Sequence, residues 1–93
     1  MRKDEDASRY ELVEGGNVIG VADYRVQGDA VVFHHTHIEP ARRGHGLGAV
    51  LVQGALDDVR RTGRSVVPIC WYVAQFIDTR SGYADLLAEV GQR

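Results

Sequence analysis

The stretch EPARRGHGLGAVLVQGALDDVRR, residues 39–61, joins a glycine-rich segment to an apolar-periodic run. From residue 47 to residue 59 apolar side chains recur at helical spacing, with polar side chains mostly opposite, which predicts a helix that stops near Thr62. Gly63 is the residue type that usually terminates a helix in a left-handed conformation. A turn from a strand into a helix needs at most one glycine, whereas this segment has three at alternate positions: Gly44, Gly46 and Gly48. The pattern therefore indicates that a ligand approaches the backbone where the helix begins.

The start of a helix favours anions, because about four N–H groups have no partner there and the dipole places roughly half a positive charge at that end. Arg42 and Arg43 add positive charge. A nucleoside-triphosphate loop would end in Gly-Lys-Ser/Thr, whereas alanine and valine follow Gly48. A dinucleotide fingerprint, which GHGLGA matches formally, requires an acidic residue about 20 positions further on, where this chain has Arg64 and Ser65. Neither pattern therefore fits the segment well.

The flanking residues predict the sheet. β-branched and aromatic residues favour strands at 9–13, 18–26 and 30–38, with the turns EGGN and QGD between them, so we expect an antiparallel meander. Pro40 ends the third strand, and SVVPIC, residues 65–70, predicts a short apolar strand after the helix. Strand, helix and strand in this order form a right-handed βαβ crossover with parallel pairing. The remaining segment, residues 71–90, predicts two short helices interrupted at Ser81 and Gly82.

The composition limits the class of protein. The chain has 93 residues, 44% of them hydrophobic and 26% charged, which suits one globular domain. A net charge of −2, with lysine and arginine scattered, argues against nucleic-acid binding. We expect no membrane span, because no apolar run approaches the required ~18 residues. The lone Cys70 and a charged N-terminal segment without a signal peptide suggest the cytoplasm. We expect residues 1–8 to be a disordered polar leader and residues 9–93 to form the domain.

The hexapeptide RGHGLG, residues 43–48, resembles the Arg/Gln-x-x-Gly-x-Gly/Ala signature of the GCN5-related N-acetyltransferases (GNAT). The resemblance narrows to a small GNAT-like family with His-Thr near a strand end, Val-Pro-x-Cys and Tyr-Ala-Asp-Leu, and these motifs cover roughly residues 33–88. It implies a minimal GNAT fold: a mixed, mainly antiparallel α/β sheet with a βαβ unit and short C-terminal helices. Larger relatives insert helices where this chain has only EGGN, so we expect an open, shallow acceptor side.

The resemblance also implies the cosubstrate and its site. Acetyl-coenzyme A would bind with its pyrophosphate on the N–H groups of residues 44–48, which are Gly44, His45, Gly46, Leu47 and Gly48. The backbone at Ile38 would meet the pantetheine and the acetyl group, where the two parallel strands splay apart. Arg42 or Arg43 could neutralise a phosphate, although solvated loop arginines are equally plausible.

Cys70 is the first candidate for chemistry. It ends a predicted strand and precedes a predicted helix, a position where the dipole favours a thiolate that could accept the acetyl group and pass it on. A direct transfer without a covalent enzyme fits the sequence equally well. A lone cysteine is also commonly just a small buried apolar residue.

His35, His37 and Glu39 are the candidates for the general base. They alternate along one strand and would share one face, with His34 and Thr36 on the other. Many relatives have an acidic residue where this chain has His37, so the base is not assigned. We expect no metal, because there is no second thiol and the three side chains are spread along a strand end. The aromatic residues of the C-terminal segment are expected mainly in the core, or lining the coenzyme cleft: Trp71, Tyr72, Phe76 and Tyr83.

Two functions follow from the sequence. The first is acetyl-coenzyme A-dependent transfer to an unidentified amine or other nucleophile, through Cys70 or directly. The alternative is a coenzyme A or acyl-coenzyme A-binding module without turnover. A protein-interaction module ranks last, because it would make every motif a coincidence. The acceptor and the oligomeric state do not follow from the sequence.

Overall fold

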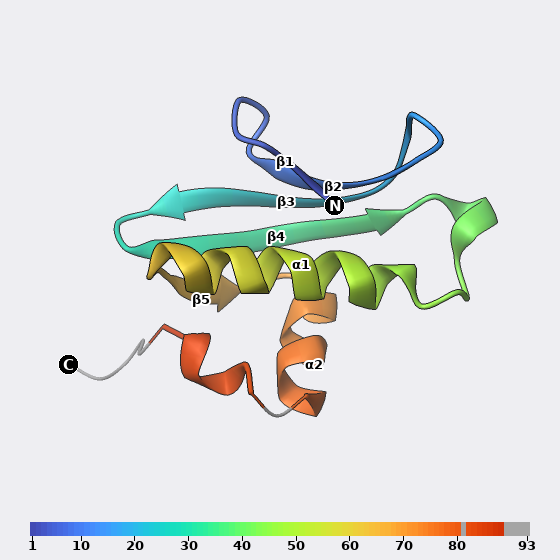
Figure 1. The fold of residues 1–93 in the computed structure, drawn as a ribbon. Helices are drawn as coiled ribbons and strands as arrows, with labels where there is room; N and C mark the ends of the chain where they lie inside the picture. The colour runs from blue at the N-terminus through green and yellow to red at the C-terminus, as the bar shows by residue number, and fades with distance from the viewer. Residues whose placement is uncertain (81, 89–93) are drawn as a thin grey trace.

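A computed structural model describes residues 1–80 and 82–88 (Figure 1). Five strands form one sheet in the order β1-β2-β3-β4-β5, antiparallel throughout except for the parallel pair β4 and β5. The elements are β1 (Arg2–Asp4), β2 (Arg9–Glu14), β3 (Asn17–Gln27), β4 (Ala30–Ile38), η1 (Pro40–Arg42), α1 (Leu47–Thr62), β5 (Ser65–Pro68), α2 (Trp71–Thr79) and η2 (Ala84–Leu86).

Most of the predicted elements are confirmed. The meander β2-β3-β4 and the unit β4-α1-β5 have the predicted order, and α1 ends at Thr62 as its spacing indicates. Gly63 adopts φ +77°, and its N–H donates to the carbonyl of Arg60 at 3.1 Å. After α2 the structure differs, because η2 is a 3-10 turn of three residues where we expected a second helix. Gly82 has φ +103° at the predicted interruption, and Ser81 and residues 89–93 lie outside the described residues.

The expectation of a disordered leader over residues 1–8 is wrong, because Arg2–Asp4 forms β1 and pairs with β2. The guanidinium of Arg2 lies 2.6 Å from the Glu11 carboxylate, and the ammonium of Lys3 lies 3.1 Å from that of Asp58. The polar composition of this segment suggests that it is solvated. The residues that order it, Glu11 and Asp58, lie further along the sequence and are not indicated by its composition.

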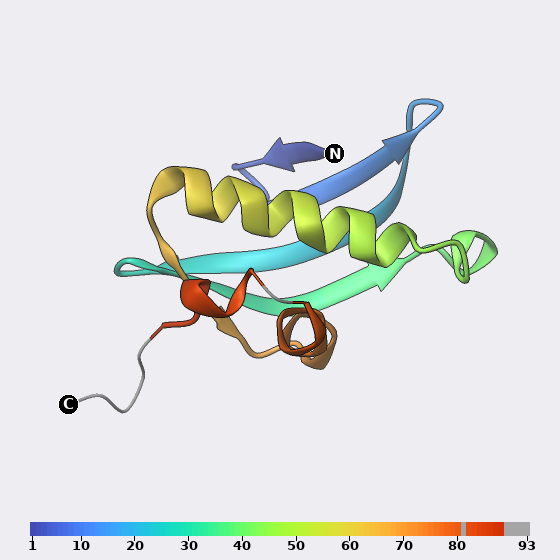
Figure 2. The same ribbon diagram turned by 60° about the horizontal axis from the view of Figure 1, so that its bottom comes forward.

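The fold has two layers. Figure 2 shows α1, α2 and η2 in front of the sheet and, among the described residues, no helix behind it. One hydrophobic core fills the space between these layers, with Tyr10 and Phe33 from the sheet, Leu51 and Leu56 from α1, and Val73 from α2. We call the other side of the sheet the open face and define it by Arg9, Val21, Asp23, His35 and His37.

A bulge in β4 decides which side chains reach each layer. Phe33 pairs with Tyr24, but His35 pairs with the preceding residue, Asp23, so His34 is an extra residue in β4. Without the bulge, His35 would share the core-facing side of Phe33. With it, His35 is exposed on the open face, and Thr36 lies opposite the fully buried Ala22 on the side of α1.

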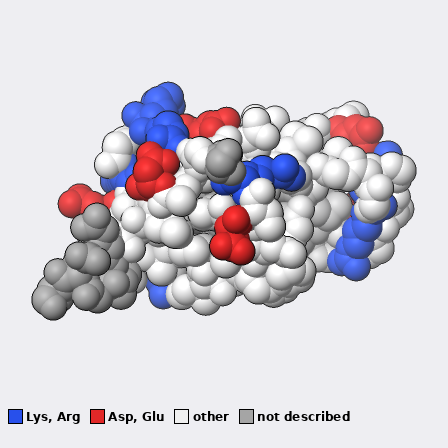
Figure 3. Space-filling model, turned by 90° about the horizontal axis from the view of Figure 1, so that it is seen from below, with Lys and Arg blue, Asp and Glu red and all other residues white. Residues whose placement is uncertain are grey.

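The charges on the surface are dispersed. Figure 3 shows basic and acidic side chains on the lower face in separate small groups of both signs, with uncharged surface between them. No helix among residues 1–80 and 82–88 is long and apolar enough to cross a membrane.

Candidate active site

A cavity of about 380 Å³ lies at the N-terminal end of α1, bounded by the end of β4, the segment that leads into α1, and the start of α2. The predicted residues that line it are His37, Ile38, Arg42, Arg43, Gly44, Gly46, Leu47, Gly48 and Cys70. Three further lining residues were not predicted as ligands: Thr36, Trp71 and Tyr72. His35, Glu39 and His45 are predicted site residues that do not line this cavity.

The segment that leads into α1 has free hydrogen-bond donors. Gly44 and Gly46 have φ +85° and +74°, conformations that L side chains rarely adopt, and a Cβ on either would meet nothing within 4 Å. The first hydrogen bond of α1 runs from the N–H of Val50 to the carbonyl of Gly46, at 3.3 Å. Within the described part of the chain, no acceptor faces the N–H groups of residues 44–49. This arc of backbone therefore has the donors and the helix dipole that bind an anion.

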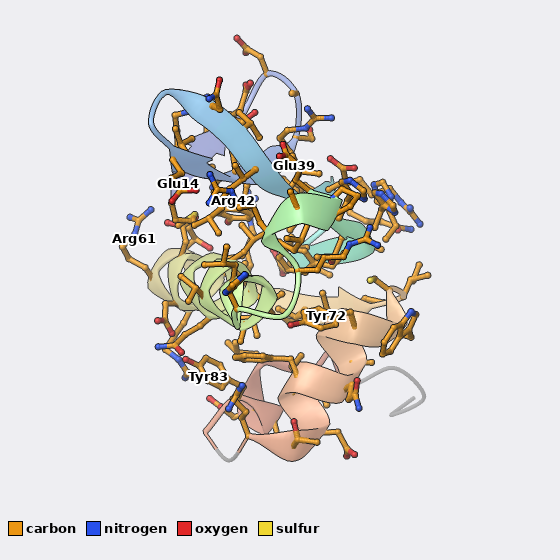
Figure 4. All side chains as sticks on the ribbon, turned by 90° about the vertical axis from the view of Figure 1, so that its right-hand side faces the viewer. Glu14, Glu39, Arg42, Arg61, Tyr72 and Tyr83 are labelled. Atoms are coloured by element: carbon orange, nitrogen blue, oxygen red, sulfur yellow. The ribbon has the colours of Figure 1, made fainter. Side chains whose placement is uncertain are left out.

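Gly48 is required for a different reason from the other two glycines. A Cβ on Gly48 would lie 2.5 Å from the hydroxyl oxygen of Tyr72 and 2.9 Å from the ring carbon that bears it. The missing side chain therefore makes room for Tyr72, which lies between the start of α1 and α2 (Figure 4). The sequence does not reveal this role, because a glycine that makes room for a ring cannot be told apart, in sequence, from one that makes room for a ligand.

Both arginines of the segment have partners within the chain. The guanidinium of Arg42 forms an ion pair with Glu14 of the β2-β3 hairpin at 2.9 Å, and the two side chains lie together in Figure 4. The Nε of Arg43 donates to the carbonyl of Ile38 at 2.9 Å. These contacts fasten the segment to the sheet at two points, and both arginines line the cavity.

The parallel strands separate beside the cavity, as predicted. Pairing of β4 with β5 ends at Phe33 and Pro68, followed by one hydrogen bond from the N–H of Cys70 to the carbonyl of Phe33, at 2.9 Å. On the opposite edge, the N–H of Glu39, just after β4, donates to the carbonyl of Ile19 in β3 at 2.8 Å. Because strand residues alternate in direction, the main-chain groups of Thr36 and Ile38 point away from β3, into the gap. The gap therefore offers a strand edge to a ligand, although the carbonyl of Ile38 on that edge already accepts from Arg43.

Cys70 lies at this gap, half-buried, as the N-cap residue of α2. Its carbonyl accepts from the N–H of Ala74 at 3.1 Å. Its Sγ donates to the Oγ1 of Thr36 at 3.4 Å. The thiol therefore lies at the positive end of a helix with a hydroxyl beside it, on the α1 side of the sheet.

The predicted histidines lie mainly on the open face. His35 and His37 share one side, as predicted, with ring centroids 6.4 Å apart and nearly parallel rings. His34 is the extra residue of the bulge, and Thr36 rather than a histidine contacts the thiol of Cys70. Of the three base candidates only His37 borders the cavity, and Glu39 is an exposed residue after the strand end. His35 and Glu39 therefore lie outside the cavity, His35 because the bulge turns it toward the open face.

Two observations complete the site. Among residues 1–80 and 82–88 no group of three or more histidine, cysteine or acidic side chains is arranged to hold a metal ion. Phe76 is buried in the core as expected, but Trp71, at 71% exposure, is not a core residue. Trp71 instead lines the cavity, which is the other position expected for these aromatic residues.

Comparison with solved structures supports the same fold. A GCN5-like protein of Staphylococcus aureus, assigned only provisionally as an N-acetyltransferase, superposes with a TM-score of 0.68 at 17% identity, over 92% of this chain and 86% of its own. The ribosomal-protein-S18-alanine N-acetyltransferase of Escherichia coli superposes with a TM-score of 0.57 at 21% identity, over 60% of this chain. The matched part is only 37% of that enzyme.

Sequence comparisons give the family. A search of curated proteins finds no match. The family model described as GCN5-related N-acetyltransferase matches residues 9–86, which include the meander, the glycine segment and Cys70. The chain therefore belongs to the GCN5-related N-acetyltransferase family.

Proposed function

We propose that this protein binds acetyl-coenzyme A in the cavity at the start of α1 and transfers its acetyl group to an amine or another nucleophile. The observation that carries the proposal is that one cavity joins the residues with free N–H groups, Gly44, Gly46, Leu47 and Gly48, to the gap between β4 and β5. A ligand with a phosphate at one end and an extended amide chain at the other matches this arrangement. Coenzyme A has both parts.

The residues would divide the donor between them. The pyrophosphate would accept hydrogen bonds from the N–H groups of Gly44 to Gly48, with Arg42 and Arg43 at the border of the cavity. The pantetheine amides would pair with the edge of β4 at the main-chain groups of Thr36 and the N–H of Ile38, whose carbonyl already accepts from Arg43. This arrangement would put the thioester near Cys70, the lining residue at the inner end of the gap.

Transfer requires an acceptor that reaches the thioester from the solvent side. The amine nitrogen would form a bond to the carbonyl carbon, the bond from that carbon to the coenzyme sulfur would break, and a proton from the amine would leave with a base. His37 is the base candidate that borders the cavity. The transfer would run directly or through an acetylated Cys70.

Turnover separates the enzyme from its rival, a coenzyme A-binding module without catalysis. The protein is incubated with acetyl-coenzyme A and a panel of free amino acids, polyamines, and peptides with a free N-terminal alanine or an internal lysine. Release of the coenzyme thiol and acetylated product are measured, with Gly46→Glu as the inactive control. The peptides are included because the related E. coli enzyme acts on the alanine of a ribosomal protein. Product from any acceptor, absent in the control, supports the enzyme. Tight coenzyme binding without product from any acceptor would favour the binding module.

A further inference from the structure

The side chain beside the candidate nucleophile is a threonine, and nothing in the proposed function yet uses it. Thr36 lies on the α1 side of β4 only because the bulge at His34 resets the alternation of the strand. Its Oγ1 is 3.4 Å from the Sγ of Cys70, and both residues border the same cavity. The hydroxyl and the thiol thus meet where the proposed donor would present its thioester.

We propose that Thr36 is a positioning residue for Cys70, holding its sulfur toward the gap and stabilising its thiolate, so that acetyl transfer passes through Cys70. This inference rests on the proposed function. A threonine hydroxyl can both accept and donate. It accepts from the thiol in the resting state. Once the thiol loses its proton, the same hydroxyl can rotate to donate to the sulfur.

The surroundings of Cys70 favour this role. Its main chain is fixed on both sides, by the bond from its N–H to Phe33 and by the bond that Ala74 donates to its carbonyl. The sulfur therefore has little freedom except rotation of its own side chain, and Thr36 is its hydrogen-bond partner among the described side chains. The N-terminus of α2 and the hydroxyl would act together on the charged form of the sulfur.

The two chemical steps balance. In the first, the Cys70 sulfur forms a bond to the acetyl carbon and the bond from that carbon to the coenzyme sulfur breaks. The proton that left the Cys70 thiol ends on the coenzyme thiol. In the second, the acceptor nitrogen bonds to the acetyl carbon, the bond to Cys70 breaks, and a proton from the amine returns to the Cys70 sulfur.

The test uses the fact that the chain has a single cysteine, so alkylation reports on Cys70 alone. The rate of modification by iodoacetamide is measured against pH for the wild type, Thr36→Val and Thr36→Ser. Valine keeps the β-branched shape and removes the hydroxyl, whereas serine keeps the hydroxyl. His37, Arg42, Arg43 and Tyr72 are the titratable or charged groups that share the cavity, and all stay in place in both variants.

We expect Thr36→Val to react about tenfold more slowly near pH 7, with its pH midpoint moved upward, as for the loss of one hydrogen bond to a charged group. Thr36→Ser should recover the wild-type profile. The matched control is Thr62→Val, which removes a hydroxyl that donates to the carbonyl of Val59 far from the cavity. It should leave the profile unchanged.

A second arm tests the acetyl transfer. Each protein is mixed with acetyl-coenzyme A without acceptor, and acetyl-Cys70 is measured by mass spectrometry. We expect acetylation in the wild type and Thr36→Ser, and about tenfold slower acetylation in Thr36→Val. An unchanged alkylation profile in Thr36→Val, or failure of serine to rescue it, would overturn the positioning role. Amide product from a Cys70→Ala variant at the wild-type rate would overturn the route through Cys70 while leaving the proposed function intact.

Discussion

Each end of α1 has a glycine in the left-handed conformation, but the main-chain groups at the two ends find different partners. Gly46 precedes the helix and Gly63 follows it, both in the left-handed conformation. At the C-terminal end the chain provides its own partners, because the N–H of Gly63 bonds to Arg60 and the hydroxyl of Thr62 donates to Val59. At the N-terminal end the N–H groups of residues 44–49 have no hydrogen-bond partner within the described residues, and Gly44, Gly46, Leu47 and Gly48 line a cavity. The comparison teaches that one end of the helix stabilises the fold and the other is available for a ligand.

A polar network closes the last turns of α1 against the sheet. The Asp58 carboxylate accepts from the hydroxyl of Tyr10 at 2.7 Å and from Arg61 at 2.6 Å, and lies 3.1 Å from the ammonium of Lys3. Burial alone would raise the pKa of Asp58, but these hydrogen bonds outweigh it and lower the pKa to about 2. Burial, together with the same carboxylate, raises the pKa of Tyr10. The network therefore adds stability at a distance from the candidate site.

Replacing each of these two glycines with glutamate tests the comparison between the two ends of α1 and has the largest expected effect. Gly46→Glu places a side chain and a negative charge among the free donors and should weaken acetyl-coenzyme A binding by more than ~100-fold, about 2.7 kcal/mol. Gly63→Glu introduces comparable backbone strain, since the two φ angles are +74° and +77°, and should cost about 1 kcal/mol of stability. Its coenzyme affinity should match the wild type in calorimetry. Equal loss of affinity in both variants would mean that the two ends do not differ in function.

Removing the central carboxylate should cost stability but not binding. Asp58→Asn should lower the free energy of unfolding at pH 7 by about 2 kcal/mol, measured by denaturant titration. The pKa of Asp58 falls from 3.8 in the unfolded chain to about 2 in the fold. Its contribution is therefore complete above about pH 4 and lost as the pH falls through about 2. The variant should show a shallower loss of stability over this interval, and an unchanged slope would argue against the network.

Gly48 and Gly54 separate two roles of glycine within α1. Gly48→Ala would place a Cβ 2.5 Å from the hydroxyl oxygen of Tyr72, so the ring must move, and the variant should cost about 1 kcal/mol despite the better helix propensity of alanine. Gly54→Ala approaches only the flexible side chain of Met1, at 3.2 Å, and should stabilise the protein by about 0.5 kcal/mol. Thermal unfolding of both variants measures the difference. Stabilisation by both would show that Tyr72 yields without cost.

The smallest effect is expected where the C-terminal end of α1 meets η2. Arg60 and Asp85 form an exposed ion pair at 2.8 Å, and the hydrogen bond from Arg60 lowers the pKa of Asp85. Exposed pairs contribute little, so Asp85→Asn should leave the unfolding free energy almost unchanged. Addition of salt should remove that small difference, whereas the network around Asp58 should persist because its carboxylate is mostly buried.

Local signals in the sequence were sufficient for most of the fold. The limits of α1 follow from its periodicity and from Gly63, and the parallel pairing of β4 with β5 follows from the order of the elements. The position of the glycine segment at the cavity was also predictable, because the N-terminus of a helix has unpaired N–H groups and glycine readily adopts positive φ.

What could not be predicted depends on contacts between distant residues. The bulge at His34 is a register shift set by pairing with β3. Because of this shift, the side chain on the same side as Cys70 is that of Thr36 and not that of His35. The pairing of Arg42 with Glu14 joins a loop to a distant hairpin. Strand β1 is ordered in the same way, through Asp58. The spacing of residues along the chain does not indicate which distant residues will be in contact.

The most direct test of the central claim is a titration of acetyl-coenzyme A into the wild-type protein, followed through the backbone amide resonances. The account predicts saturable binding, with the largest shifts at the N–H groups of residues 44–49 and at Thr36 and Ile38, and little change at Gly63 and Asp58. Absence of binding, or shifts concentrated at the C-terminal end of α1, would contradict it.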